Sequence, residues 1–337
     1  MTQAIHSTIT PRAFIWRRIH SLTGLWFLIF LCEHLLTNSQ SMMFFTVHAP
    51  WFVNSVNFLR NIPYIKAVEI TLLGVPILLH AGIGIRLLFT GRLNTTPTDG
   101  ATPYLRYGRN HAYSWQRVSA VVLLVGLILH VVDMRFLDYP YQYVVNDQNQ
   151  YYNTYHFDPG LYSVANQLRV QLYDAQGIDY EKQKLRSMRE REILLREHLE
   201  NLEKKAWRLG EENEYQQEIN TAYRSLSDYQ AQTDHVRGLE SRTLKEGYVM
   251  GVSPSFGALE LLNVRERFQS LSWCVLYTIF VLAAVFHGGN GLWTFLITWG
   301  LLLSKKSQSN MVHFCTGLIF LLGVFGMMSI WGTFLLG

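Results

Sequence analysis

The chain has 337 residues, of which 49% are hydrophobic and 16% are charged, and its formal net charge is +4. Of the 25 Asp and Glu residues, 20 lie between residues 139 and 266, together with 15 of the 29 Lys and Arg residues. The rest of the chain is apolar and basic. This contrast argues against one globular core and favours a membrane protein that carries an inserted polar module.

Five apolar runs reach the length of roughly 20 residues that crosses a bilayer as a helix. They cover residues 19–37, 67–90, 114–137, 270–303 and 311–336. We therefore predict an all-α integral membrane bundle of five transmembrane helices. Residues 1–138 are expected to hold the first three helices, residues 267–337 the last two, and residues 139–266 an inserted domain.

Basic residues flank these runs unequally. The ends on one side of the predicted membrane are the start of the first run, the link between the second and third runs and the link between the fourth and fifth. They carry Arg12, Arg17, Arg18, Arg86, Arg92, Arg106, Arg109, Arg117, Lys305 and Lys306. The opposite ends carry Arg60, Lys66, Arg135 and Arg267. The positive-inside rule then places the N-terminus in the cytoplasm, and the C-terminus and the insertion outside. No small-residue cleavage site follows the first run, so no cleaved signal peptide is expected.

Histidines are the candidate metal ligands inside the runs. The cysteines form no CxxC or CxxCH pattern, which argues against a disulfide framework and covalently attached haem. Four histidines lie in the interior of the first four runs, one in each: His34, His80, His130 and His287. A single intramembrane histidine is explained most simply by a hydrogen bond to a neighbouring helix. Four on separate helices match two haems whose irons each take two imidazole nitrogens.

The depth of each histidine follows from a rise of about 1.5 Å per helical residue. Counted from the flanking basic residues, His34 and His130 lie towards the outer surface and His80 towards the inner surface. The depth of His287 is ambiguous, because the fourth run is longer than a bilayer requires, and its pairing with His80 is by elimination. Small residues follow two of these histidines and would make room for a flat macrocycle, although close helix packing also favours glycine; they are Gly82, Gly84, Gly288, Gly289 and Gly291.

The insertion opens with an aromatic and polar stretch over residues 139–157 and continues with two heptad-like series. The first series is Leu185, Met188, Leu195, Leu199, Leu202, Ala206 and Leu209, with Glu192 in one core position, and the second is Tyr215, Ile219, Ala222, Leu226, Tyr229, Thr233 and Val236. The spacing slips at Gly210. We predict a mostly helical insertion built on an antiparallel coiled-coil hairpin, with one long helix containing a stutter as the alternative. The insertion either docks a partner or mediates oligomerisation, or it is a lineage-specific addition that has no role in electron transfer.

Five segments in or beside the apolar runs follow one another along the chain in an order that is typical of a known protein family. These are RRIHSLTG at 17–24, EHLLTN at 33–38, VEITLLGVPILLHAGIGI at 68–85, SWQRVSAVVLLVGLILHVVDMR at 114–135 and FHGGNGLWTFLITWG at 286–300. In these features the chain resembles the di-haem, five-helix cytochrome b subunit that anchors succinate dehydrogenase or quinol:fumarate reductase in the membrane. The insertion departs from that family, in which the third and fourth helices have a short connection.

The resemblance implies a function in electron transfer. The anchor would bind two b haems, with His34 and His130 on the outer iron and His80 and His287 on the inner iron. It would relay electrons between an iron–sulfur subunit and a membrane quinone, with menaquinone favoured, while the flavin chemistry lies on a separate flavoprotein subunit. The implied location is the cytoplasmic membrane of a bacterium, and no nucleic-acid partner is expected.

Ionisable groups near the haems are the candidates for contact with quinone and with haem propionates. Quinone reduction takes up protons, so a carboxyl group at the site is useful. Glu33, expected to be the most deeply buried acid of the first run, is the leading candidate, with Asp133 and Glu69. Each of the three has the alternative role of an interfacial carboxylate or a partner for Arg135 or Lys66. Propionate contacts are expected from Arg17, Arg18, His20 and Arg117, although ordinary positive-inside anchors would look the same.

Two other functions fit some of these features. The first is a di-haem cytochrome b that anchors a hydrogenase or a formate dehydrogenase. The second is a transporter that uses intramembrane histidines as a proton relay. A reduced-minus-oxidised spectrum separates haem proteins from the transporter, and capture of a flavoprotein with covalent FAD separates complex II from the other anchors.

Overall fold

The computed structural model describes residues 12–90, 108–209 and 212–337. The chain divides into two compact units. The first, here the membrane unit, comprises Met1–Asp133 and Arg267–Gly337, and the second, the insertion unit, comprises Met134–Glu266. Arg92 and Arg106, used above to orient the chain, lie outside the described residues.

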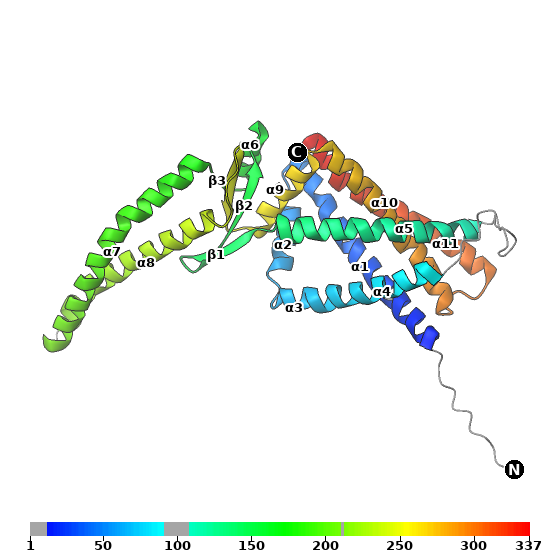
Figure 1. The fold of residues 1–337 in the computed structure, drawn as a ribbon, viewed down its shortest axis with the longest axis horizontal. Helices are drawn as coiled ribbons and strands as arrows, with labels where there is room; N and C mark the ends of the chain where they lie inside the picture. The colour runs from blue at the N-terminus through cyan, green and yellow to red at the C-terminus, as the bar shows by residue number, and fades with distance from the viewer. Residues whose placement is uncertain (1–11, 91–107, 210–211) are drawn as a thin grey trace, which may run out of the picture. The chain divides into compact units, whose positions relative to one another are not determined.

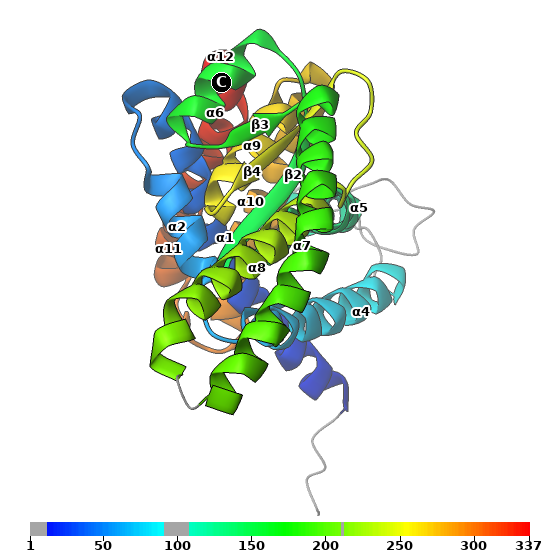
Figure 2. The ribbon, with the colours of Figure 1, turned by 90° about the vertical axis from the view of Figure 1, so that its left-hand side faces the viewer.

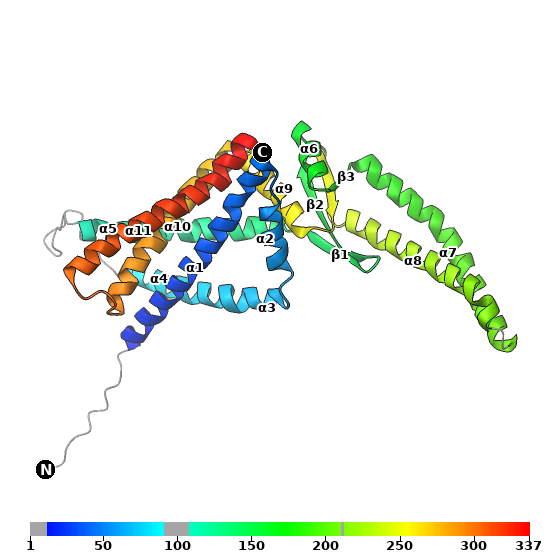
Figure 3. The same cartoon turned by 180° about the vertical axis from the view of Figure 1, so that it is seen from behind.

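The regular elements in the described part of the membrane unit are all helices (Figures 1 and 3). Its elements are α1 (Arg12–Val47), α2 (Trp51–Arg60), α3 (Ile65–Glu69), α4 (Val75–Thr90), α5 (Gly108–Val131), α10 (Leu271–Thr298), α11 (Lys305–Met327) and α12 (Thr333–Leu336), with π-helical segments η1 (Ile70–Gly74), η2 (Val132–Leu137) and η3 (Met328–Gly332). Among these residues, five continuous helical stretches are long and apolar enough to cross a membrane: Arg12–Val47, Ile65–Thr90, Asn110–Leu137, Leu271–Thr298 and Lys305–Leu336. The prediction of an all-α bundle with five membrane spans is confirmed.

Helices α1 and α10 are the central members of the bundle. Helix α1 contacts α4, α10 and α11, and α10 contacts α5 and α11. Glycine lets the backbones approach at these contacts. A Cβ atom on Gly126 of α5 would lie 2.3 Å from the Phe280 ring of α10, and one on Gly289 of α10 would lie 2.3 Å from Ile319 of α11. These two glycines therefore serve helix packing.

The connection between α10 and α11 follows from local residue chemistry. Gly300 has a φ of +73° and donates its N–H to the Ile297 carbonyl at 3.0 Å, which is the left-handed glycine ending common to helices. Four residues later, the Ser304 hydroxyl accepts a hydrogen bond from the Ser307 N–H at 3.1 Å and caps the start of α11. Lys305 and Lys306 open that helix.

The insertion unit combines an antiparallel sheet with helices. Its elements are β1 (Tyr141–Val145), β2 (Gln148–His156), α6 (Pro159–Gln167), β3 (Gln171–Tyr173), α7 (Ala175–Leu209), α8 (Glu212–Leu239), β4 (Tyr248–Ser253) and α9 (Phe256–Phe268), of which the last runs into the membrane unit. The strand order is β1-β2-β4-β3 and every pairing is antiparallel. Figure 2 shows β2, β4 and β3 side by side. The insertion is mostly helical, as predicted, but this sheet was not predicted from the sequence.

The two faces of β2 are both buried, which is why its pattern is not a simple apolar–polar alternation. On one face, Tyr152 packs in a core with Ile178 of α7 and Leu239 of α8. On the other face, the Tyr155 hydroxyl donates to the Leu259 carbonyl of α9 at 2.9 Å. Burial in these positions raises the pKa of both tyrosine hydroxyl groups.

Helices α7 and α8 form an antiparallel hairpin, as predicted (Figures 1 and 2). The side chains of Leu199, Leu202, Ala206 and Ala222, all members of the predicted series, are buried. The Tyr223 hydroxyl of α8 donates to the Glu203 carboxylate of α7 at 2.7 Å. A single long helix is therefore excluded, while the slip at Gly210 lies outside the described residues.

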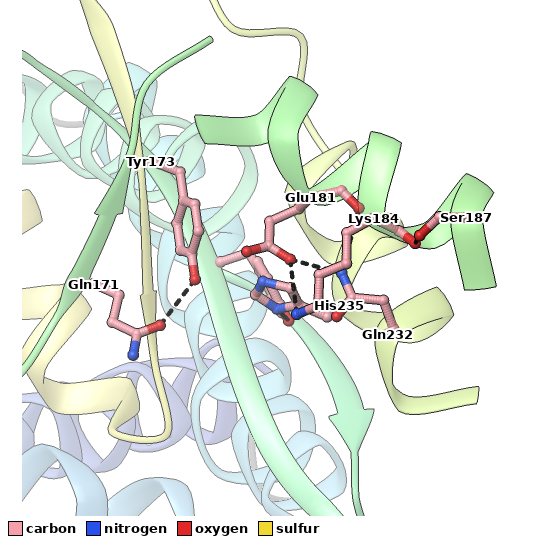
Figure 4. A network of polar contacts seen from close by, with 8 residues as sticks. Gln171, Tyr173, Glu181, Lys184, Ser187, Gln232 and His235 are labelled. Atoms are coloured by element: carbon pink, nitrogen blue, oxygen red, sulfur yellow. Dashed lines mark hydrogen bonds and ion pairs between the residues drawn. The ribbon is translucent and has the colours of Figure 1, made fainter. Parts of the chain in front are cut away.

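A polar network joins the base of this hairpin to the sheet (Figure 4). The Gln232 amide of α8 donates to the Glu181 carboxylate of α7 at 2.7 Å, and Lys184 lies 3.5 Å from the same carboxylate. His235 of α8 is half-buried, with its Nδ1 atom 3.0 Å from the Tyr152 hydroxyl of β2. Burial lowers the pKa of His235, and the nearby Glu181 carboxylate partly opposes that effect.

Candidate functional site

The side chains of His80 on α4 and His287 on α10 face each other across the membrane unit. Their ring centres are 6.3 Å apart and their planes are inclined at 80°. A third ring lies beside them: His20 of α1 stacks on His80 with a centre distance of 4.0 Å and an interplanar angle of 14°. We refer to these two opposed rings as the His80–His287 pair.

Hydrogen bonds determine which nitrogen of His80 carries the proton. Its Nδ1 atom lies 3.0 Å from the His20 carbonyl oxygen and 3.2 Å from the Thr23 hydroxyl. The Thr23 hydroxyl donates its own hydrogen to a backbone carbonyl of α1, so its oxygen accepts here, and a carbonyl oxygen can only accept. Nδ1 of His80 is therefore the protonated nitrogen, and the Nε2 lone pair remains for a metal.

His287 is held in a similar way. Its Nδ1 atom lies 3.4 Å from the Ser119 hydroxyl of α5, and that hydroxyl donates to the Gln116 carbonyl at 3.1 Å. The Gln116 amide in turn donates to the His287 carbonyl at 3.1 Å and accepts from Asn290 at 2.8 Å. Helix α5 thus orients the His287 ring through neighbouring polar side chains.

A second pair is formed by His34 of α1 and His130 of α5. Their ring centres are 5.9 Å apart and their planes are inclined at 78°. The Tyr277 hydroxyl of α10 lies 3.1 Å from Nδ1 of His130, and the Phe280 ring flanks the same imidazole at 5.9 Å. The Phe30 ring stacks on His34 at 5.4 Å. We refer to this arrangement as the His34–His130 pair.

The spacing of both pairs suits a metal ion between two imidazoles. Nitrogen ligands at about 2 Å from a metal place the two ring centres roughly 6 Å apart. Within the described residues, no cluster of three or more His, Cys, Asp or Glu side chains is placed to hold a metal ion. Each pair offers two nitrogen ligands, and a porphyrin would supply the other four ligands of a haem iron. The residues present therefore fit a haem at each pair.

The glycines expected beside the haems differ in their surroundings. A Cβ atom on Gly84 would lie 3.3 Å from the His20 ring, and one on Gly288 would lie 3.0 Å from Leu28. A Cβ atom on Gly82 would meet open space, and one on Gly291 would meet only the Gln116 amide at 3.9 Å. Together with Gly289, which packs on α11, these positions show that helix packing accounts for part of the glycine pattern.

The three candidate carboxylates lie in different environments. Glu33 is exposed on the surface of α1 and accepts a hydrogen bond from the Thr37 hydroxyl at 2.9 Å. The expectation that Glu33 is deeply buried is wrong for the protein interior, because its side chain is exposed although its partner Thr37, one turn further along α1, is buried. Asp133 is buried, with 7% exposure, and pairs with Arg267 at 2.8 Å. Glu69 is partly buried at the start of η1.

The basic side chains expected to contact propionates lie at one end of the helices. Arg17 is exposed, and the guanidinium of Arg18 lies over the Trp299 ring at 4.7 Å. Arg117 donates to the Leu88 carbonyl of α4. These contacts show how the side chains are placed, and their role towards propionates stays a prediction, as does that of His20.

The residues that hold the imidazole rings were not predicted from the sequence. Thr23, Ser119, Gln116 and Tyr277 each lie on a helix other than that of the histidine they contact. The available signal was positional, because Thr23 and Ser119 stand in otherwise apolar stretches close to the depth of a candidate histidine. Hydroxyl residues are common in such stretches, so this signal alone has little specificity.

The described residues define a multi-pass membrane protein with an all-α bundle that brings histidines from four spans into two pairs. Over 125 residues, or 37% of this chain, it is 32% identical to the succinate dehydrogenase cytochrome b558 subunit of Bacillus subtilis (strain 168). The chain spans 56% of the length of that curated relative. No family model matches the chain, and no solved structure matches it.

Proposed function

We propose that this chain is the membrane-anchor cytochrome b subunit of a succinate:quinone oxidoreductase. The two histidine pairs carry the proposal, because each joins separate spans at a spacing suited to a bis-imidazole haem. The similarity to a succinate dehydrogenase cytochrome b558 subunit supports the same reading. The partners would be a flavoprotein subunit and an iron–sulfur subunit, and the flavin chemistry would lie on the flavoprotein.

In this proposal the chain's residues hold and orient two b haems. His34 with His130 would bind one iron and His80 with His287 the other, and each bound haem would carry one electron at a time. Two imidazoles per iron leave no open coordination position, which suits a relay of electrons. For His80, His130 and His287, the hydroxyl partners would keep Nδ1 engaged and leave Nε2 for the iron.

The quinone site is proposed beside the His34–His130 pair, with menaquinone favoured. Glu33 is next to His34 in the chain and is exposed at the surface of α1, where a lipid-soluble substrate has access. Asp133 already neutralises Arg267, and a carboxylate held in an ion pair is a poorer proton carrier at neutral pH. Glu33 is therefore the leading candidate to exchange a proton with quinone, followed by Asp133 and Glu69.

The proposed location is the cytoplasmic membrane of a bacterium. The N-terminus would face the cytoplasm, where the soluble subunits dock, while the C-terminus and the insertion would face outwards. The orientation rests on the distribution of Arg and Lys beside the spans. The basic side chains Arg17, Arg18 and Arg117 would then lie on the docking side.

Co-purification tests the proposed function. A tag on the chain expressed in its own host should retain a protein with covalently bound FAD and a second protein with iron–sulfur clusters, and the eluate should oxidise succinate. Recovery of a hydrogenase or formate dehydrogenase would assign the chain to another anchor class. Recovery of the chain without any redox protein and without haem would exclude both the succinate dehydrogenase anchor and the other anchor class.

A further inference from the structure

Helices α1 and α4 are joined by two histidines that bond to each other's backbone. The His80 Nδ1 atom donates to the His20 carbonyl oxygen at 3.0 Å, and the His20 Nδ1 atom donates to the His80 carbonyl oxygen at 3.1 Å. The two rings stack between these bonds with centres 4.0 Å apart and planes inclined at 14°. The arrangement is reciprocal, because each residue supplies one donor and one acceptor.

The same short sequence pattern produces both halves. HSLTG at 20–24 and HAGIG at 80–84 each place a glycine four residues after the histidine. A Cβ atom on Gly24 would lie 3.0 Å from the His80 ring, and one on Gly84 would lie 3.3 Å from the His20 ring. Each glycine therefore leaves room for the histidine of the opposite helix.

Helix geometry explains why the glycine stands at this spacing. The carbonyl of residue i accepts the N–H of residue i+4 in an α-helix. A side chain at i+4 stands beside that carbonyl and obstructs a second donor from a neighbouring helix. Glycine at positions 24 and 84 keeps the carbonyls of His20 and His80 open to the opposite imidazole.

We propose that His20, Gly24, His80 and Gly84 form a reciprocal histidine–glycine clamp, in which His20 is a positioning residue for His80. The clamp holds α4 against α1 and holds the His80 ring with Nδ1 protonated, so that Nε2 is the nitrogen presented to iron. The inference rests on the proposed function, since it takes His80 to be an axial ligand. His20 itself is not a ligand of that iron, because its ring lies parallel against His80 and not opposite it.

The clamp is tested by replacing Gly24 with alanine and measuring the haems of the purified complex. Gly24→Ala places a methyl group against the His80 ring, whereas Gly317→Ala, a control at an exposed glycine of α11, meets nothing within 4 Å. The readouts are the electron paramagnetic resonance signal and the midpoint potential of each haem, because both respond to the orientation of the axial rings. Gly24→Ala should shift or remove the signal of one haem only, and Gly317→Ala should leave both unchanged.

Substitution of His20 separates the two contributions of its ring. His20→Phe keeps a ring for stacking and loses the bond to the His80 carbonyl, whereas His20→Asn keeps an amide donor and loses the stack. Both should retain two haems per chain and alter the signal of the same haem that Gly24→Ala alters. His20→Ala, which lacks both contacts, should give the largest shift.

The outcomes distinguish failure of the clamp from failure of the proposed function. If the parent protein contains two haems and the Gly24→Ala and His20→Ala proteins show unchanged signals and potentials for both, the clamp is overturned and the haem assignment stands. If equal changes occur in both haems, the residues act on the bundle as a whole and the clamp is likewise overturned. A parent protein without haem would overturn the positioning role together with the proposed function.

Discussion

Three imidazole rings of the histidine pairs have a hydroxyl group from a different span beside Nδ1: Thr23 beside His80, Ser119 beside His287 and Tyr277 beside His130. For His34, the described residues provide stacking on Phe30 in place of such a hydroxyl. An Nδ1–H that donates to oxygen makes the other ring nitrogen a stronger ligand. These residues are therefore expected to tune the two proposed haems separately.

Loss of the Tyr277 hydroxyl should raise the midpoint potential of one haem. When Nε2 of His130 binds iron, Nδ1 carries the ring proton and the Tyr277 hydroxyl accepts from it. Tyr277→Phe keeps the ring and removes that acceptor, so the imidazole donates less electron density and stabilises the oxidised iron less. A hydrogen bond of this kind is worth about 1 kcal/mol, which corresponds to tens of millivolts for one electron. Redox titration of the purified complex measures the change.

Ser119→Ala is the matched variant for the other pair. It removes the hydroxyl beside His287 and should raise the potential of the second haem, while the haem affected by Tyr277→Phe keeps its value. If both variants shift the same haem, the pairing of the four histidines is wrong.

Glu33→Gln should slow electron exchange with quinone and leave both haems in place. Gln keeps the side-chain length and can still accept from the Thr37 hydroxyl, but it cannot carry a proton. Loss of a general acid–base group slows proton-coupled steps on the order of 100-fold. Quinone reduction with succinate is the measurement, and succinate oxidation with an artificial acceptor on the soluble subunits is the control. Normal quinone turnover would move the assignment to Asp133 or Glu69.

At the scale of secondary-structure elements, the spans and the hairpin could be predicted because their signals are local. Apolar length specifies a span, and apolar spacing specifies a hairpin helix. The sheet has no comparable signal, since both faces of β2 are covered and tyrosine fills positions on each. Its partner β4 lies about a hundred residues later in the chain. Asn146 and Asp147, with φ of 49° and 59°, form the turn between β1 and β2 and were the one local cue.

Acidification should loosen the junction between the hairpin and the sheet. The folded state lowers the pKa of His235 below its usual value of 6.5, mainly through burial. The unfolded state therefore binds a proton more readily, so stability is lost as the pH falls below about 6.5. After division by the intrinsic exchange rate at each pH, the protection of β2 and α8 amides in the intact complex should decrease between pH 7 and pH 5. In His235→Gln that loss of protection should be smaller, and an equal loss in the variant would exclude His235 as the cause.

The outer part of the hairpin should be dispensable for haem binding. Met188 and Asp228 line a common pocket between α7 and α8, so a short glycine linker can replace residues 189–227 between them. The side chains removed pack mainly on each other, as Tyr223 does on Glu203. The shortened protein should keep its full haem content, measured by the pyridine haemochrome assay. Loss of haem would show that the hairpin supports the membrane unit.

At the scale of the whole molecule, the sequence predicted a membrane bundle and an insertion. It did not predict how the membrane-spanning helices pack against one another. All four proposed ligands, their hydroxyl partners and the carboxylate candidates belong to the membrane unit. The choice of partner for each histidine depends on the contacts of α1 with α4 and of α5 with α10. Depth along the chain grouped His34 with His130, but only the packed bundle places His80 opposite His287 at 6.3 Å. The interhelical hydrogen bonds could not be inferred without those crossings.

The haem content of the purified protein tests the central claim most directly. The parent protein should contain two b haems per chain, and His80→Leu should contain one, because leucine fills the space of the ring but cannot bind iron. The remaining haem should keep the midpoint potential of the haem held by His34 and His130. Two haems with unchanged spectra in His80→Leu, or no haem in the parent protein, would contradict the account.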